Sequence, residues 1–353
     1  MQSEWQSFLV SNGAQLADGH VDHFGDATAE REALSGDVIA DLSHFGVIAA
    51  SGNDTVEFLQ GQVTNDVRRV DTATSQLNSY CTPKGRILAT FRLFYRDGVH
   101  YLRMPAERVP FILKRLRMYV LRSQVLLEDV SDALARFGIA GPRASALLAD
   151  ALGADVPQED GGVLQSDDML VMRTPGGRFE CHGTPEALAH LWRKLAPQAR
   201  PVGRDAWMLT EIRAGIPHVV DATSEAFVPQ MLNLHAVGGV SFRKGCYTGQ
   251  EVVARMQYLG KLKRRMFLAH VDGSCPAPGD ELFAAEVESG QGTGKVVNAQ
   301  PAPGGGCDLL AVALIEAVDS GMTVRIGDAQ GAVLRFMPLP YAVDELGDTQ
   351  APS

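Results

Sequence analysis

The chain of 353 residues has a formal net charge of −10 and is 45% hydrophobic. This acidic total argues against a protein whose entire surface binds nucleic acid. The chain lacks an apolar run long enough to cross a bilayer, and its N-terminus, MQSEWQSFLV, lacks the features of a secretory signal. We therefore expect a cytoplasmic protein of about two to three domains, with no membrane association.

The cysteines are odd in number and scattered, and none belongs to a Cys-x-x-Cys pair. Such a set favours neither a disulfide framework nor a zinc site, so reduced thiols and no metal site are expected. The five are Cys81, Cys181, Cys246, Cys275 and Cys307.

The N-terminal segment, residues 1–35, is polar and weakly patterned, and a short helix around Ala27 to Leu34 is expected there. Further on, GVIAASG indicates a strand that leads into a helix with Phe58 and Leu59 on its apolar face. SYCTPKGRILATFRLFYRDGVHYLRM indicates strands joined by glycine turns. Apolar residues at helical spacing then predict an amphipathic helix from Ala106 to Met118.

Residues 131–196 have a distinct order of predicted elements. LARFGIAG indicates a strand, Pro142 to Leu152 a helix, and MLVMRT with RFECHG a hairpin. Thr184-Pro185-Glu186 opens a second helix, with a hydroxyl at the cap and proline in the first turn. Strand, helix, hairpin and helix in this order predict a ferredoxin-like α+β subdomain.

After Leu262 the helix signals end, and short strands alternate with glycine and proline turns. This pattern predicts a C-terminal β-barrel over residues 263–345 and a flexible tail over 346–353. The stretch GQGTGK, from Gly290 to Lys295, resembles a phosphate loop. It lacks the Ser or Thr after lysine that such a loop needs, so we interpret it as a turn.

The stretch SFRKGCYTGQEVVAR places Cys246 in a glycine-rich turn beside Lys244. Thr248 and Glu251 have the spacing of a capping box, which predicts a helix that begins near Gly249. The apolar residues Val252, Val253 and Met256 would then point inward. A helix N-terminus and a lysine would both lower the pKa of the Cys246 thiol.

Plain structural explanations remain open for these residues. A single cysteine in a glycine turn is often a packing residue, and Glu251 and Arg255 are spaced to pair on a helix surface. The basic residues Arg243 and 261–265 suit a solvated face as well as a contact surface.

The longer region RAGIPHVVDATSEAFVPQMLNLHAVGGVSFRKGCYTGQEVVAR resembles the signature of the YgfZ family. FLQGQVTNDV, YCTPKGR and the closing PLPY also resemble family segments, so the resemblance spans residues 41–341. The family comprises folate-binding proteins of the aminomethyltransferase fold that support iron–sulfur cluster assembly or repair. The resemblance implies an α+β protein with two intertwined domains, one ferredoxin-like, plus a C-terminal β-barrel. Residues 36–130 and 197–262 would form the aminomethyltransferase-like, folate-binding domain.

The resemblance also implies site residues. Tetrahydrofolate or a derivative is the expected cofactor, and Cys246 with Lys244 the expected functional pair. Trp207 and Phe45 match the family's folate-binding aromatics, although Trp207 suits a core position equally well. The amides of Gln230 and Asn233 are the right type to read a pterin edge, or belong to a polar loop. The motif adds further expected folate contacts at Tyr247, Glu251 and Arg255.

Two departures from the pattern bear on chemistry. True aminomethyltransferases have carboxylates after the turn that here is Lys84-Gly85, where this chain has Ile87-Leu88-Ala89. Folate-binding relatives often have an acid at the position of Arg213, which here has Glu211 two residues earlier. Arg213 would instead face a glutamate tail or a channel rim, and whether the protein is an enzyme stays open.

Three hypotheses follow. The first is a folate-binding accessory factor for iron–sulfur enzymes, including those that modify tRNA, with transient client or assembly proteins as partners. The second is a folate-dependent one-carbon (aminomethyl or methyl) transferase with an unknown acceptor. The third is a docking module that uses residues 261–265; the acidic total argues against direct nucleic-acid binding.

Overall fold

The computed structural model describes residues 3–285 and 293–343 and shows two compact units. Unit 1 comprises Met1–Thr55, Arg69–Gln76 and Arg92–Thr210, and unit 2 comprises Val56–Arg68, Leu77–Phe91 and Glu211–Ser353. The chain passes back and forth between the units, so its α+β domains are intertwined, as the resemblance implied. The predicted domain limits at 36, 131, 197 and 263 are not limits of these units.

Unit 1 contains a six-stranded sheet of order β10-β11-β12-β9-β3-β13. Its core is the predicted ferredoxin-like order of strand, helix, hairpin and helix, and β3 is inserted between β9 and β13. β13 runs parallel to β3, and the other neighbours are antiparallel. The elements are β3 (Val38–Asp41), β9 (Ala135–Ala140), α5 (Ala144–Leu152), β10 (Val163–Gln165), β11 (Met169–Thr174), β12 (Arg178–Gly183), α6 (Pro185–Leu195) and β13 (Arg200–Val202).

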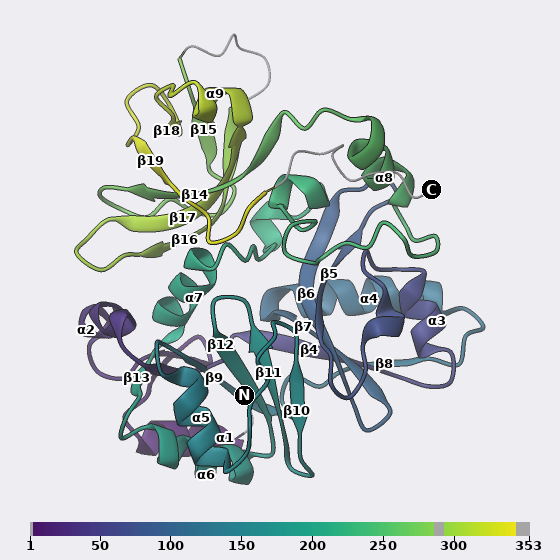
Figure 1. The fold of residues 1–353 in the computed structure, drawn as a ribbon, viewed down its shortest axis with the longest axis vertical. Coiled ribbons are helices and arrows are strands. Elements are labelled where there is room, and N and C mark those ends of the chain that lie inside the picture. Colours follow the sequence, from purple (N-terminus) through teal and green to yellow (C-terminus); the bar gives the residue numbers. More distant parts are fainter. Residues whose placement is uncertain (1–2, 286–292, 344–353) are drawn as a thin grey trace. The chain divides into compact units, whose positions relative to one another are not determined.

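The N-terminal segment contributes more to unit 1 than its composition suggests. It forms α1 (Ser3–Ser11), β1 (Gln15–Ala17), β2 (His20–His23) and α2 (Ala27–Glu32). Trp5 and Leu9 on α1 are buried in the same core as α5 and α6, which lie close to α1 in Figure 1. The indole nitrogen of Trp5 donates to Asp41 at 2.8 Å. The predicted helix around Ala27 to Leu34 is confirmed by α2, while α1, β1 and β2 were not predicted.

A second, antiparallel group of strands in unit 1 consists of β7 (Val99–Pro105), β4 (Phe45–Ser51) and β8 (Leu126–Asp129), with the end of β6 (Ile87–Arg96). Helix α4 (Val109–Val120) follows a short 3-10 turn over Ala106–Arg108, close to the predicted helix. Its buried face, which packs near β4 and β8, consists of Val109, Ile112, Leu113 and Leu116.

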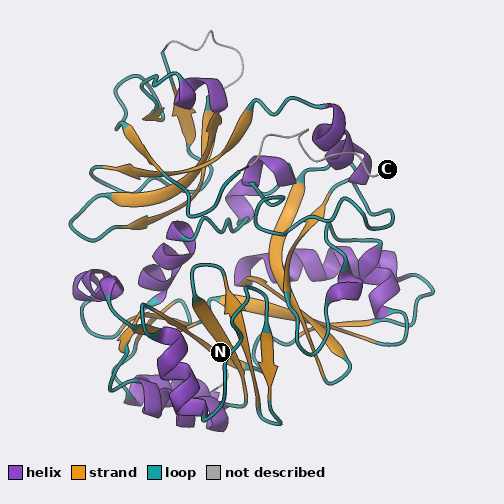
Figure 2. Ribbon diagram, viewed as in Figure 1, coloured by secondary structure: helices purple, strands orange, loops and turns teal. Residues whose placement is uncertain are grey.

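Unit 2 contains the predicted barrel, a six-stranded sheet of order β18-β15-β16-β17-β14-β19. A bridge between Arg325 and Val333 joins its two ends, so the sheet closes on itself. The strands are β14 (Arg264–Val271), β15 (Glu281–Phe283), β16 (Gly294–Pro301), β17 (Cys307–Leu314), β18 (Arg325–Ile326) and β19 (Leu334–Met337). Figure 2 shows one short helix among these strands, α9 (Ile315–Asp319), where no helix was expected.

The barrel contains a disulfide that the cysteine pattern did not predict. Cys275 and Cys307 form a disulfide, so the expectation that all cysteines are reduced was wrong for this pair. They are 32 residues apart in sequence, and only the β14–β17 pairing brings them within bonding distance. The first residues of GQGTGK and the predicted tail lie outside the described residues, while Gly294 begins β16.

The rest of unit 2 includes most of β5 (Gln76–Cys81), the start of β6 and the helices α3 (Thr55–Gln60) and α8 (Gln250–Leu259). Helix α7 (Arg204–Arg213) runs from unit 1 into unit 2. Among the described residues, no helix combines the length and apolar character that a bilayer crossing requires.

Candidate functional site

Cys246 is exposed on the segment that precedes α8, residues 241–249, which we call the thiol loop. Helix α8 begins at Gln250, and its N-cap is Gly249 with a φ of 87°. No side chain caps this helix, so the predicted capping box of Thr248 and Glu251 was wrong. A left-handed residue starts the helix instead, and glycine is the residue that adopts this conformation without strain.

The inward face of α8 is narrower than predicted. Val253 is buried, but Met256 is only partly covered and Val252 is exposed. The rest of unit 2 therefore covers only a narrow strip of α8, and the other side of this helix is exposed to solvent.

Lys244 is buried and fixes the thiol loop in unit 2. Its ammonium donates to the backbone carbonyls of Gln60, Val63 and Asn65 at 2.7, 2.6 and 3.0 Å. It also lies 5.0 Å from the ring centre of Tyr247. Burial lowers the pKa of Lys244 to about 8, although nearby Asp66 opposes this shift.

These contacts give Lys244 a structural role that the sequence did not predict. A lysine ammonium has three donors, and all three are used by main-chain oxygens at the end of α3 and in the turn after it. The lysine thereby holds the chain two residues before Cys246 in one position.

Three segments that resemble the family signature meet at the thiol loop, although they are far apart in sequence. Besides the lysine contacts, the amide of Ser241 donates to Thr64 at 3.0 Å, and the amide of Thr248 to Gly61 at 3.3 Å. The side chain of Asn65 donates to the carbonyl of Gly238 at 2.6 Å. The segment FLQGQVTNDV, residues 58–67, therefore packs directly against the thiol loop.

The segment YCTPKGR, residues 80–86, contacts the C-terminal end of the thiol loop at Gly249. A Cβ on Gly249 would lie 2.5 Å from the Thr82 carbonyl and 3.1 Å from Cα of Gly85. A Cβ on Gly85, whose φ is 68°, would lie 3.0 Å from Cβ of Val252. The two glycines therefore allow a close approach of the two backbones where α8 begins, and Gly249 has no room for a side chain.

The other predicted residues of unit 2 divide into exposed and buried groups. Glu251 and Arg255 are exposed on α8, and Tyr247 is buried beside Lys244. Burial raises the pKa of Tyr247. Gln230 is buried and donates to the Val253 carbonyl at 2.6 Å, which ties the turn Pro229–Leu232 to α8.

Asn233 and Arg213 lie apart from the thiol loop. Asn233 is buried and donates to the Met266 carbonyl of β14 at 2.9 Å. Arg213 forms an ion pair of 2.9 Å with Asp308 of β17. The nearby acid Glu211 is buried and lies 3.2 Å from His218. Both the arginine that replaces the expected acid and the acid beside it thus have partners in unit 2.

Phe45 and Trp207 belong to one hydrophobic cluster of unit 1, and both rings are fully buried. Trp207 lies on Gly138, where a Cβ would come within 2.2 Å of its ring. The guanidinium of Arg178 lies 5.6 Å from the Trp207 ring centre, and that of Arg103 lies 4.0 Å from Phe45. Each aromatic that the resemblance implied is therefore in contact with a buried arginine.

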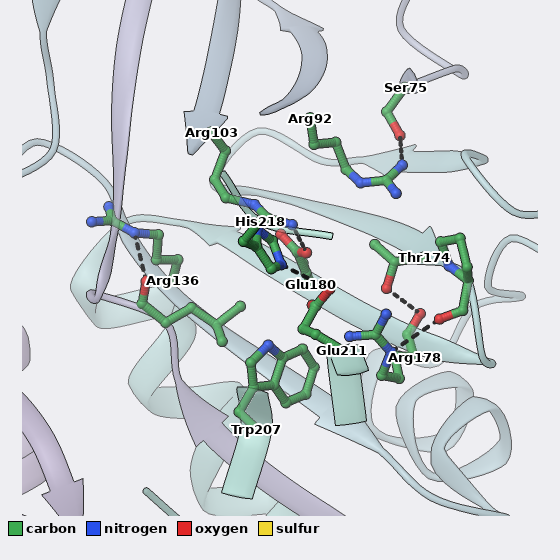
Figure 3. Close-up of polar contacts among 12 residues, drawn as sticks. Ser75, Arg92, Arg103, Arg136, Thr174, Arg178, Glu180, Trp207, Glu211 and His218 are labelled. Carbon is green, nitrogen blue, oxygen red and sulfur yellow. Dashed lines mark hydrogen bonds and ion pairs between the residues drawn. The ribbon is translucent and has the colours of Figure 1, made fainter. Parts of the chain in front are cut away.

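A charged cluster surrounds these rings in unit 1. Figure 3 shows the ion pair between Arg103 on β7 and Glu180 on β12, and Arg178 beside Trp207. His182 lies 3.3 Å from Glu180, and burial lowers the pKa of this histidine even though Glu180 opposes the shift. Arg103 has a further donor, Nε, and Trp207 has its indole N–H; neither has an acceptor within the described part of the chain.

The sequence analysis missed this cluster, although a signal was present. In RFECHG, Arg178, Glu180 and His182 alternate with Phe179 and Cys181, which places the three polar residues on one face of β12. The apolar residues on the other face belong to the core with α5 and α6. A strand that is buried on both faces but charged on one indicates a polar interior.

The comparisons with known proteins agree with this architecture. Residues 22–241 match the family model described as the GCVT N-terminal domain. The chain is 34% identical over 311 residues to the tRNA-modifying protein YgfZ of Yersinia enterocolitica, which covers 86% of this chain and 92% of that protein. It is 32% identical over 309 residues to the protein of the same name from Colwellia psychrerythraea, with 86% and 93% coverage.

A solved structure shows the same fold. The glycine cleavage system aminomethyltransferase T from Bartonella henselae superposes with a TM-score of 0.75 at 16% identity, over 98% of this chain and 99% of that one. This likeness confirms the predicted aminomethyltransferase-like fold with its C-terminal barrel.

Proposed function

Because the chain belongs to the YgfZ family, we propose that it is a tetrahydrofolate-binding accessory protein for iron–sulfur cluster assembly or repair. Cys246 is the functional thiol in this proposal, and enzymes that modify tRNA are among the clients, as the name of the relatives suggests. The observation that carries the proposal is the exposed Cys246 on a loop that buried Lys244 anchors through three carbonyls.

The other free cysteines offer a useful contrast. Cys81 and Cys181 are buried, and burial raises the pKa of Cys81 to about 12 and that of Cys181 further. Such thiols are poor nucleophiles and poor metal ligands, because the thiolate is the reactive form. Within the described residues, Cys246 is therefore the free thiol that a partner protein can reach.

A single thiolate cannot hold an iron–sulfur cluster that needs about four protein ligands. Among residues 3–285 and 293–343, no group of three or more His, Cys, Asp or Glu side chains is arranged to hold a metal ion. In our proposal a client protein supplies the remaining ligands, and Cys246 completes the set or acts as a redox thiol.

The charged cluster of unit 1 suits a reduced folate. The unsatisfied donors on Trp207 and Arg103 are buried, and buried donors normally have an acceptor. A pterin has carbonyl and ring-nitrogen acceptors, and the folate tail has carboxylates that guanidinium groups bind well. We assign Trp207, Arg103, Arg178 and Glu180 as the residues that hold the folate. When bound, it supplies a one-carbon unit or reducing equivalents.

Aminomethyl transfer is the less favoured function. The fold alone is compatible with it, but Ile87, Leu88 and Ala89 are buried apolar residues of β6 and offer no carboxylate. An iminium-like intermediate needs such a group to direct protons or stabilise charge.

The proposal is tested by anaerobic calorimetric titration of tetrahydrofolate and by restoration of tRNA modification in cells that lack the protein. Trp207→Phe keeps the ring but removes the indole N–H, so folate affinity should fall by about tenfold. Trp192→Phe is the matched control, because Trp192 also has an unpaired indole N–H but lies among aromatic and aliphatic side chains. It should bind folate normally.

Cys246→Ser should bind folate like the wild type and fail to restore tRNA modification. A serine variant with full activity in cells would remove the thiol from the mechanism. Absence of folate binding in the wild type would refute the cofactor assignment and leave the thiol assignment intact.

A further inference from the structure

The outer face of α4 in unit 1 exposes large apolar side chains that the fold itself does not explain. Its inner face accounts for the helix, since Val109, Ile112, Leu113 and Leu116 are buried. The side chains of Phe111, Met118, Tyr119, Leu121 and Leu126 remain between 41% and 87% exposed. These residues lie on α4, in the turn after it and at the start of β8. Scattered exposed apolar residues are normal, but a group within such a short segment commonly marks an interaction surface.

The same segment is strongly basic. Residues 108–127 contain no Asp or Glu, although the whole chain has a net charge of −10. Arg108 lies 4.9 Å from the ring centre of Phe111, and Arg117 donates to the Leu127 carbonyl through Nε at 3.1 Å. The basic residues of this segment that are at least partly exposed are Lys114, Arg115, Arg117 and Arg122, while Arg108 is buried. We call these four residues, together with the five exposed apolar ones, the α4 face.

The turn after α4 presents Leu121 from a fixed backbone. Leu121 has a φ of 47° and a ψ of −103°, a positive-φ conformation that is costly for a leucine, and its side chain is 87% exposed. The following residues are held in place, because the amide of Gln124 donates to Asp54 at 2.7 Å and Asn53 donates to the Gln124 side chain at 3.1 Å. A strained and exposed leucine in an anchored turn gives no packing benefit to the free protein.

We propose that the α4 face docks a protein partner that presents apolar side chains flanked by carboxylates. Phe, Tyr, Met and Arg are the residue types enriched at protein interfaces. Met118, Leu121 and Leu126 are aliphatic and would add little to RNA binding, which relies on base stacking. A symmetric dimer through this face would place four cations against four, so a second copy is the wrong occupant.

The probe for this proposal is a fluorescein-labelled peptide of Glu and Leu that forms an acidic amphipathic helix, measured by fluorescence anisotropy. The wild-type protein should bind it, and added salt should weaken binding because charge contributes. Lys114→Glu/Arg122→Glu and Met118→Ser/Leu121→Ser should each weaken binding by about tenfold or more. All four side chains are exposed, so both variants should unfold at the wild-type temperature.

Val10→Ser is the matched control, since Val10 is an exposed apolar residue on α1 of the same unit. It should bind the peptide like the wild type, and so should Cys246→Ser, because the proposal does not depend on the thiol. A photoreactive benzoylphenylalanine in place of Met118 should cross-link to the peptide, and one in place of Val10 should not.

Three results would overturn the proposal. The first is that the wild type does not bind the peptide, or that both α4-face variants bind it with the wild-type affinity. The second is tighter binding of tRNA or of phosphatidylglycerol vesicles that the same variants abolish, which would assign the face to RNA or to a lipid surface. The third is a concentration-dependent dimer of the protein alone that both variants dissociate.

Discussion

The ammonium of Lys244 lies 2.6 Å from the carbonyl oxygen of Val63, a residue 181 positions earlier in the chain. This contact, with those to Gln60 and Asn65, joins the thiol loop to the turn after α3. The exposed Cys246 thus lies two residues after a lysine whose charge is buried. Burial of a charge costs free energy unless the charged group is fully hydrogen-bonded. Among the contacts that hold the loop, Lys244 is the one that supplies three hydrogen bonds from a single side chain.

Loss of this side chain should destabilise unit 2. Lys244→Met leaves three carbonyls without their donor, and we expect the free energy of unfolding to fall by about 2–4 kcal/mol. Urea denaturation at neutral pH measures this change. Lys263→Met removes an exposed lysine and should change stability by less than about 0.5 kcal/mol. Equal effects of the two substitutions would contradict the anchoring role.

The pH dependence of stability should report the same lysine. Burial lowers the pKa of Lys244 from 10.5 to about 8 in the folded chain, while the unfolded chain keeps the ordinary value. Between these pKa values the unfolded chain binds more protons, so the contribution of Lys244 to stability rises with pH. The difference in unfolding free energy between wild type and Lys244→Met should therefore grow from about pH 8 to about pH 10, by at most about 1.4 kcal/mol per pH unit. A difference that is flat or shrinks over this range would show that the ammonium is not disfavoured by burial.

The two glycines beside the thiol should respond differently to substitution. Gly249→Ala introduces a side chain at a φ of 87° and 2.5 Å from the Thr82 carbonyl, so we expect a loss of about 1–3 kcal/mol. Gly245→Ala is the matched control, because a Cβ there meets nothing within 4 Å. Thermal unfolding and the rate of Cys246 alkylation measure both effects. The alkylation rate should change in the Gly249 variant and stay near the wild-type value in the Gly245 variant.

The Arg103–Glu180 pair should show strong coupling. Both side chains are almost completely buried, so Arg103→Met removes the cation that pairs with the buried Glu180 carboxylate. The free energy of unfolding should therefore fall by about 3–5 kcal/mol. The double variant Arg103→Met/Glu180→Met should be more stable than the sum of the single losses predicts, because no buried charge is left alone. Chemical denaturation of the four proteins of this cycle tests the expectation. Strict additivity would mean that the two groups do not interact in solution.

Patterns within short segments predicted much of this fold. The ferredoxin-like order of elements, α4 and the C-terminal barrel all follow from periodicity and turn residues, which are local properties. The Lys84-Gly85 turn and the helix after Gly249 were predicted for the same reason. Local reasoning failed where a tertiary contact overrode a local signal. Thr248 and Glu251 have capping-box spacing, but the helix starts from a left-handed Gly249 that lies close to Gly85.

Contacts between residues far apart in sequence could not be predicted from local patterns. Spacing cannot reveal that Trp5 donates to Asp41, that Cys275 bonds Cys307, or that Glu180 pairs with Arg103. Each of these contacts exists because strands or helices from distant segments lie side by side. The sequence by itself predicted that Cys246 lies in a glycine-rich turn beside a lysine, and the resemblance indicated the family. The contacts of Lys244 with the backbone were decided by tertiary packing, since residues 60–65 bring three carbonyl oxygens to one ammonium only in the folded chain.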